Sequence, residues 1–450
     1  MSLFKVVSGK YLRFKLGLTP QQNLFYGFLT YVSMGTLLLC IPCFHKSSVA
    51  FIDNFFIATS AVSTTGLATV SVLDSYNFFG QFIILVLIQL GGIGYLTFTT
   101  FMILSTTRKM TRWHKNILKT EFTLPKTIEI KDFLKSVIFF TLAMEIIGTI
   151  LYFIAFKKLE LDFFDTLWNA LFHSVSAFCT AGFSLFSNGF ESFSGDFLVN
   201  TTTSLLAIAG SLGFIVVTDF VLSLKKKDHH LSFTTKIILV GSAVLLLFGF
   251  MFFFFFEPVI KNLTGAERMW AAFFQSMSAM TTVGFNTVDF GAFVMPMLLV
   301  TIFLMYIGAS PSGTAGGMKI TTLTAVIAIM KSRLRNTQRI TFFGRIIPYE
   351  RLFVATSSFI FYTSLIALGT FLLSFLEDFH LEDLLFEVSS ALGTVGLSTG
   401  ITGDLGTWGK LVIIALMFIG RLGVLTFGLA IWAKHHNNPK NHPIRDDIAV

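Results

Sequence analysis

The sequence predicts an all-α integral membrane protein built from four consecutive helix–loop–helix units in a pseudo-fourfold arrangement. Of its 450 residues, 54% are hydrophobic and 13% are charged, a composition that excludes an ordinary soluble domain with a polar surface. Eight apolar segments are each long enough to span a bilayer as a helix, which takes about 20 residues. One short motif recurs four times between them, and such repetition defines an architecture before any single residue is interpreted.

The eight predicted spans group in pairs along the chain. The first is longer than the core of a signal peptide and no small-residue cleavage site follows it, so we expect it to be retained. The spans cover residues 23–44, 78–105, 133–156, 197–224, 237–256, 293–329, 352–376 and 409–433. We therefore expect a cytoplasmic N-terminal segment over 1–22, units over 23–107, 132–225, 236–335 and 350–433, and a cytoplasmic tail over 434–450.

Charged residues alternate between the loops on the two sides of the predicted spans. Basic residues gather before the first span and after the second, fourth and sixth, whereas acids such as Asp74, Asp162 and Asp289 occupy the opposite loops. The positive-inside rule then places both termini on the cytoplasmic side of a multi-pass protein of the cell membrane. The net charge of +8 is expected to meet membrane lipid headgroups, and we predict no nucleic-acid partner.

The repeated motif reads F-x-x-x-S-A-x-x-T-x-G and lies between the two spans of every unit. Its members are Phe56, Ser60, Ala61, Thr64 and Gly66; Phe172, Ser176, Ala177, Thr180 and Gly182; Phe274, Ser278, Ala279, Thr282 and Gly284; and Phe386, Ser390, Ala391, Thr394 and Gly396. Each copy starts in an apolar segment of about three helical turns, which is too short to cross and must re-enter from the acidic, outer side. Lipid offers no hydrogen-bond partners, so such a loop is tolerated only where protein buries it or where it lines a watery cavity.

The end of each motif has the composition of a cation site. Rings of backbone carbonyls can replace the water shell of a cation, and glycine allows the backbone angles that turn carbonyls inward. The partly negative C-terminal ends of the four short helices also favour a cation between them. The four segments are Thr64, Thr65 and Gly66; Thr180, Ala181 and Gly182; Thr282, Val283 and Gly284; and Thr394, Val395 and Gly396. We predict that they form an ion selectivity filter around a central ion pore.

With these motifs the chain resembles the Trk/Ktr/HKT superfamily of potassium transporters, specifically the Ktr-type ion-conducting membrane subunit. The resemblance covers nearly the whole chain, with four helix–pore loop–helix units, eight spans and a glycine in every loop as in the potassium-selective members. It implies potassium at the filter residues, sodium as a further candidate ion, and no organic cofactor on this chain. It also implies a homodimer and a separate cytosolic ring of nucleotide-binding regulatory subunits, of the ATP/ADP or NAD type.

The sixth span is interrupted by a segment that a continuous helix disfavours, because it holds a proline and several glycines. The segment comprises Gly308, Ala309, Ser310, Pro311, Ser312, Gly313, Thr314, Ala315, Gly316, Gly317, Met318 and Lys319. By resemblance it is an intramembrane gating loop below the filter, and a kinked helix with no gating role is the alternative. Arg421 in the eighth span is costly inside a membrane. By resemblance it restricts the pore under the filter, whereas pairing with Glu145 is the alternative.

Glycines also cluster in the second helix of each unit. They are Gly91, Gly92 and Gly94; Gly210 and Gly213; Gly308; and Gly420 and Gly423. Small residues let helices approach closely, and we predict this packing role for them. One residue departs from the family pattern, since Cys179 stands where the resemblance leads us to expect a polar amide.

A secondary cation antiporter with a broken-helix binding site is the alternative function. It accounts for the broken sixth span, but inverted repeats would place half of the loops on the inner side, where the basic residues lie. An enzyme is not expected, because no H-E-x-x-H, G-x-S-x-G or Walker motif occurs. His173 and Glu145 are isolated in the sequence, and we predict no catalytic residue.

Overall fold

The computed structural model describes residues 18–94, 130–225, 231–308 and 310–432. Some of the predicted features lie outside these ranges, namely residues 1–17 of the N-terminal segment, the end of the first unit at 95–107, Ala309 of the sixth-span loop, and the tail at 434–450.

The described chain is mostly helical. Its α-helices are α2 (Pro20–Leu39), α3 (Phe51–Ser63), α4 (Val72–Ser75), α5 (Phe78–Ile93), α8 (Ile130–Phe156), α9 (Phe163–Phe178), α10 (Phe197–Lys225), α11 (Phe233–Phe256), α12 (Pro258–Lys261), α13 (Gly265–Thr281), α14 (Met295–Tyr306), α15 (Ile320–Leu334), α16 (Tyr349–Leu376), α17 (Leu381–Gly393), α18 (Thr407–Leu422) and α19 (Val424–Trp432). Short 3-10 turns cover Pro42–Phe44, Lys157–Leu159, Glu191–Phe193, Phe290–Ala292 and Ile401–Asp404.

Several helices have the length and apolar composition of membrane spans. Among the described residues, α8, α10, α11 and α16 qualify, and a fifth span results if α18 and α19 are joined across their 97° bend. Large apolar side chains on these helices face outward, and Phe139, Phe353 and Phe375 are 78%, 72% and 76% exposed. So large an apolar surface suits contact with lipid rather than water.

Three predicted spans are interrupted at glycines that the sequence analysis assigned to packing alone. Helix α5 ends at Ile93 next to Gly94 (φ 84°), α10 is kinked at Gly213 (φ 83°), and Gly423 (φ 82°) separates α18 from α19. A positive φ cannot continue a right-handed helix, and only glycine adopts it without a β-carbon penalty. The expectation of continuous helices over 197–224 and 409–433 was therefore wrong at these points.

A short β-hairpin corrects the prediction of a purely α-helical protein. Strands β1 (Thr341–Phe342) and β2 (Arg345–Ile346) pair antiparallel between α15 and α16. The two turn residues, Phe343 (φ 46°) and Gly344 (φ 73°), both have positive φ. This is the condition for the tight turn whose twist matches that of a hairpin.

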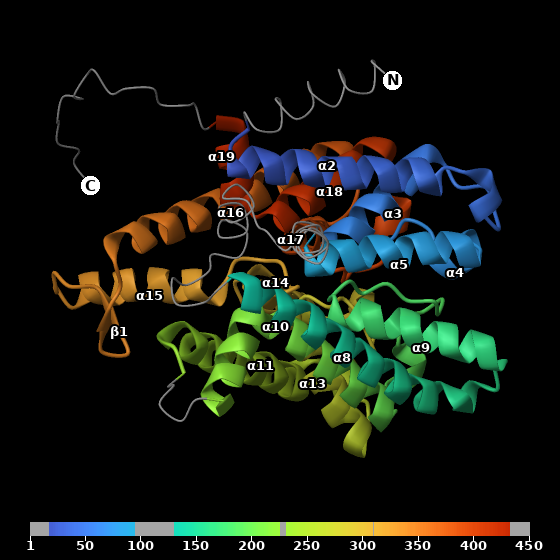
Figure 1. The fold of residues 1–450 in the computed structure, drawn as a ribbon, viewed down its shortest axis with the longest axis horizontal. Helices are drawn as coiled ribbons and strands as arrows, with labels where there is room; N and C mark the ends of the chain where they lie inside the picture. Colours follow the sequence, from blue (N-terminus) through green and yellow to red (C-terminus); the bar gives the residue numbers. More distant parts are fainter. Residues whose placement is uncertain (1–17, 95–129, 226–230, 309, 433–450) are drawn as a thin grey trace.

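The last helices of the chain pack against the first, so that the fold closes on itself (Figure 1). The ring of Phe418 in α18 lies 5.4 Å from the rings of both Phe25 and Phe28 in α2. The side-chain amide of Gln22 donates to the carbonyl oxygen of Ala430 in α19. The short helices α3, α9, α13 and α17 lie inside, with their C-terminal halves fully buried.

Candidate functional site

Each of the four buried short helices ends in the same unusual backbone conformation. The motif threonine is left-handed in every copy, with φ of 52° at Thr64, 50° at Thr180, 55° at Thr282 and 48° at Thr394. The N–H of the residue after it donates back to the carbonyl of the motif serine, over 2.8 to 3.2 Å. A β-branched residue rarely adopts this conformation. The chain therefore reverses direction sharply at the start of every predicted filter segment.

The four T-x-G segments come together in a closed ring. A β-carbon added to Gly66 would lie 2.5 Å from the carbonyl oxygen of Ala181, and one added to Gly182 would lie 2.6 Å from that of Val283. A β-carbon added to Gly284 would likewise collide with the carbonyl oxygen of Val395, and one added to Gly396 would collide with that of Thr65. Each glycine thus approaches the backbone of the next segment, and the last approaches the first. Only glycine allows backbones to come this close.

The motif serines hold these segments in place through their hydroxyl groups. Ser60 and Ser390 each accept a hydrogen bond from the N–H of the glycine in their own segment, at 3.1 Å. Ser176 and Ser278 instead donate to the carbonyl of the residue after that glycine, Phe183 at 2.8 Å and Phe285 at 2.6 Å. In the sequence these serines are recognisable only as part of the repeat, and their equal spacing was the signal for this supporting role.

Glycines of the second helices pack against the ends of the short helices. A β-carbon at these glycines would collide with the carbonyl oxygen two residues before the left-handed threonine. The contacts pair Gly91 with Val62, Gly210 with Phe178 and Gly420 with Leu392. The predicted close packing is confirmed at these three positions.

The break in the sixth span forms a loop that is hydrogen-bonded to the kink in α10. The N–H of Ser310 donates to the carbonyl of Ser211 at 3.3 Å, and that of Thr314 donates to Gly210 at 3.1 Å. In return, the N–H of Phe214 donates to the carbonyl of Ser312 at 3.2 Å. These bonds replace the helical hydrogen bonds that both broken helices lack. Irregular backbone at membrane depth needs such partners, because lipid offers none.

The same loop contacts the ring of T-x-G segments directly. The Thr180 hydroxyl donates to the Thr314 hydroxyl at 3.2 Å, and the N–H of Gly316 donates to the Thr282 hydroxyl at 3.1 Å. Gly316 also lies so close to Thr394 that a β-carbon there would collide with its hydroxyl. The structure therefore brings the predicted gate residues against three of the four predicted filter segments.

Two cationic side chains bind carbonyl oxygens of this loop. Lys319 Nζ donates to Ala315 at 2.6 Å and to Gly316 at 3.1 Å. The Arg421 guanidinium donates to the carbonyls of Thr314, Gly91 and Gly92, and so connects α18, the loop and the end of α5. Glu145, the alternative partner of Arg421, has one buried carboxyl oxygen with no hydrogen-bond partner among the described residues.

A cavity of about 330 Å³ lies beside these two cations. It is lined by Gly91–Gly94 at the end of α5, by residues 311–313 and 315–319 of the loop, and by residues 420–426 at the break between α18 and α19. Two of the three glycine breaks, at Gly94 and Gly423, and the interrupted sixth span thus border one space below the ring. Sequence reasoning missed the breaks, although Gly94, Gly213 and Gly423 each stand three residues after a packing glycine.

Cys179, which departs from the family pattern, has a polar amide beside it. Its thiol is buried and lies 3.7 Å from Oε1 of Gln89 in α5. A carboxamide therefore reaches this position from a neighbouring helix rather than from residue 179 itself.

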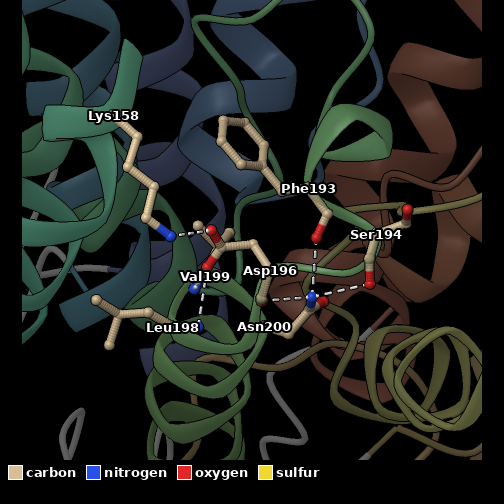
Figure 2. Close-up of polar contacts among 7 residues, drawn as sticks. All are labelled: Lys158, Phe193, Ser194, Asp196, Leu198, Val199 and Asn200. Carbon is tan, nitrogen blue, oxygen red and sulfur yellow. Dashed lines mark hydrogen bonds and ion pairs between the residues drawn. The ribbon is translucent and has the colours of Figure 1, made fainter. Parts of the chain in front are cut away.

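Outside the membrane-spanning segments, the chain after the second predicted filter segment is fixed to the start of α10 (Figure 2). The Asn200 amide donates to the carbonyls of Phe193, Ser194 and Asp196. Asp196 caps α10 by accepting from two backbone N–H groups, and its carboxylate pairs with Lys158 Nζ at 3.0 Å. Desolvation raises the pKa of Asp196, but the hydrogen bonds and the charge of Lys158 outweigh it, so the pKa lies below its ordinary value.

Comparisons with known proteins find similarity to cation and potassium transport proteins. A family profile described as TrkH, cation transport protein, matches residues 19–442. The chain is 33% identical to the Ktr system potassium uptake protein B of Bacillus subtilis, over 95% of both chains. It is also 33% identical to the potassium/sodium uptake protein NtpJ of Enterococcus hirae, over 96% of both. The potassium transporter TrkH from Vibrio parahaemolyticus has a similar fold, with a TM-score of 0.73 over 91% of this chain and 84% of that one, at 20% identity.

Proposed function

The chain belongs to the TrkH family of cation transport proteins, and on that premise we propose that it carries potassium into the cell through a selectivity filter formed by its four T-x-G loops. The observation that carries the proposal is the closed ring in which each loop glycine approaches the backbone of the next loop. The family consists of ion transporters, so no catalytic chemistry is invoked. The curated relatives named above are potassium or potassium/sodium uptake proteins, which makes sodium the competing ion.

The proposed filter works by replacing water with backbone oxygens. A potassium ion that enters the ring exchanges its hydration shell for carbonyl oxygens of the four segments. The short helices contribute as well, because each ends at its segment and directs the partly negative end of its dipole there. The repeated left-handed threonine and the motif serine give the four segments a common shape, which a ring of equivalent ligands requires.

The gate in this proposal is the loop of the broken sixth span, residues 308–317, together with Lys319 and Arg421. Its hydrogen bonds to Thr180 and Thr282 support a position directly against the filter. Lys319 and Arg421 hold the loop in place through hydrogen bonds to its carbonyls. Their positive charges also repel a transported cation in the same space. Opening would need these hydrogen bonds to break, so the closed gate would be the favoured state and only a minor fraction of the protein would conduct without a regulator.

A separate cytosolic subunit is part of the proposal, because the relative from Bacillus subtilis is named as a protein of a Ktr system. We propose that a ring of nucleotide-binding subunits acts on the cytoplasmic face and that the chain works as a homodimer in the cell membrane, with both termini inside. The regulator supplies the free energy that opens the loop.

The test is ion flux into liposomes that contain only the purified chain. Potassium, rubidium and sodium gradients are compared with and without an imposed voltage. Voltage-driven, downhill uptake that favours potassium is expected. Strict exchange against protons or sodium would contradict the proposal and favour the secondary antiporter with a broken-helix site.

A further inference from the structure

The residue that follows the motif phenylalanine is buried in every unit and differs from unit to unit. It is Ile57 in the first, His173 in the second, Gln275 in the third and Glu387 in the fourth, and each side chain is 0% exposed. Three of these four are polar groups in the interior behind the ring. A buried polar group costs free energy unless it is hydrogen-bonded, so the partners of these three residues indicate what they do.

His173 holds the outer part of the second loop. Its Nε2 accepts a hydrogen bond from the backbone N–H of Leu185 at 3.3 Å and lies 3.1 Å from the Ser184 hydroxyl. Since Nε2 is an acceptor, the proton is on Nδ1, which donates to the carbonyl of Asn169 at 2.8 Å. The imidazole is thus neutral and connects the short helix α9 to residues just beyond Gly182.

Gln275 makes the equivalent connection in the third unit. Its side-chain oxygen faces the backbone N–H of Thr287 at 2.9 Å and that of Val288 at 3.0 Å. We assign the oxygen to this position because both groups can only donate. The amide therefore joins α13 to the chain that follows Gly284.

Glu387 does the same in the fourth unit with a carboxyl group. One oxygen accepts from the Ser398 hydroxyl and the other from the Thr402 hydroxyl at 3.0 Å. The backbone N–H of Thr399 is a further donor to this side chain. Three donors from one short stretch after Gly396 converge on a fully buried group of α17.

These contacts have one geometry in common. In each case a side chain on the short helix binds residues that begin two or three positions after the filter glycine. We propose that His173, Gln275 and Glu387 are positioning residues that set the shape of the outer half of three of the four loops, and thereby the discrimination between potassium and sodium. The inference rests on the proposed filter function. Ile57 has no polar atom, so the first loop is held without such an anchor.

The test removes the anchor and restores it by a conservative change. Full-length variants Glu387→Leu and Gln275→Leu are compared with Glu387→Gln, which keeps an acceptor oxygen, and with Ile57→Leu as a volume-matched change at the unanchored position. The readout is the ratio of potassium to sodium flux in liposomes. We expect a drop of about tenfold for the two leucine variants, a change within about twofold for Glu387→Gln, and no change for Ile57→Leu.

A second approach removes a donor from the loop side. Ser398→Ala deletes one hydrogen bond to Glu387 with little change in volume, and it should lower the ratio in the same direction even if Glu387→Leu does not fold. An unaltered ratio in folded Glu387→Leu and in Ser398→Ala would overturn the inference, as would a Glu387→Gln ratio as low as that of the leucine variant. If the unmodified chain itself shows no potassium preference, the proposed filter function fails instead.

Discussion

At the residue scale, four threonines of the site adopt the left-handed backbone conformation. A non-glycine residue in this region costs on the order of 1–3 kcal/mol, and the motif repeats that cost at Thr64, Thr180, Thr282 and Thr394. The conformation persists because the following N–H bonds back into the short helix and the motif serine binds the segment beyond. Strain held in this way fixes the directions of the carbonyls that we propose to bind the ion.

Gly66→Ser should admit more sodium. The added β-carbon would meet the carbonyl of Ala181 at 2.5 Å, so the ring must widen between the first and second segments, and a wider ring fits potassium less selectively. We expect the ratio of potassium to sodium flux to fall by about tenfold, equal to about 1.4 kcal/mol of discrimination. Flux measurements in liposomes with each ion check this.

Gly344→Ser is the matched control for this change. Gly344 also has a positive φ, 73° against 97° at Gly66, but it lies in the turn of the exposed hairpin, and a β-carbon there would meet no described atom within 4 Å. It therefore carries the backbone strain of the substitution without the collision. Equal losses of selectivity in the two variants would show that the close approach in the ring is not what discriminates between the ions.

Asp196 gives a pH-dependent prediction outside the membrane-spanning segments. Its pKa is lower in the folded chain than in the unfolded one, so its contribution to stability is present above the ordinary pKa of about 3.9 and is lost as the pH falls toward the folded value. Asp196→Asn keeps the helix cap but removes the charge. The melting temperatures of the two proteins should differ at neutral pH and converge as the pH falls below about 3.9 toward the folded pKa. A gap that stays constant over this range would contradict the assignment.

At this scale, the roles of repeated residues could be predicted from the sequence, and those of unrepeated residues could not. The T-x-G segments were predictable because four copies of one pattern point to one structure. The amide beside Cys179 was not, because Gln89 lies in another helix and the contact exists only after folding. The anchors His173, Gln275 and Glu387 differ in residue type, so the repeat did not reveal that they share a position.

At the scale of elements, the broken sixth span connects several separate parts of the fold. Its loop is hydrogen-bonded to α10, to two threonines of the proposed filter and to two cationic side chains. Proline and glycine in the sequence were enough to predict the break. The breaks in α10 and between α18 and α19 were not predicted, since a glycine in an apolar helix serves close packing as readily as positive φ. The repeated three-residue spacing of the glycines was the available signal.

Shortening the loop over residues 309–317 should raise potassium flux in the absence of any regulator, because the hydrogen-bonded obstruction below the ring is removed. An increase of about tenfold would correspond to a closed state favoured by about 1.4 kcal/mol over the open one. The measurement is flux in liposomes containing the deletion variant alone. Removal of Phe343 and Gly344 from the turn of the exposed hairpin is the control, and it should leave flux unchanged. A well-folded loop deletion with unaltered flux would favour the kinked helix without a gating role.

At the scale of the whole molecule, the fourth unit must hold the first for the ring to close. Besides the aromatic contacts between α2 and α18, an ion pair joins Lys410 of α18 to Asp53 of α3 at 2.8 Å, with both side chains 13% exposed. Water screens such a pair much less than one at the surface. The two ends of the described chain are thus connected near the outer end of a short helix.

Lys410→Met should destabilise the protein by about 3 kcal/mol, because it leaves the Asp53 carboxylate buried without its partner. Lys158→Met breaks the pair with Asp196, in which the lysine is 71% exposed, and should cost less than about 1 kcal/mol. Thermal unfolding of the two purified variants in detergent compares these effects. The double variant Asp53→Asn with Lys410→Met should recover part of the loss, and similar melting temperatures for the two single variants would refute the role of burial.

The ring described here is made of four different segments of one chain, each encoded separately. A substitution in one loop therefore alters one side of the proposed ion path and leaves the other three as they were, whereas in a channel of four identical subunits the same substitution would appear on every side at once. Evolution can consequently adjust such a path in small, asymmetric steps. The four different residues found behind the ring at one equivalent position are the kind of divergence that this freedom permits.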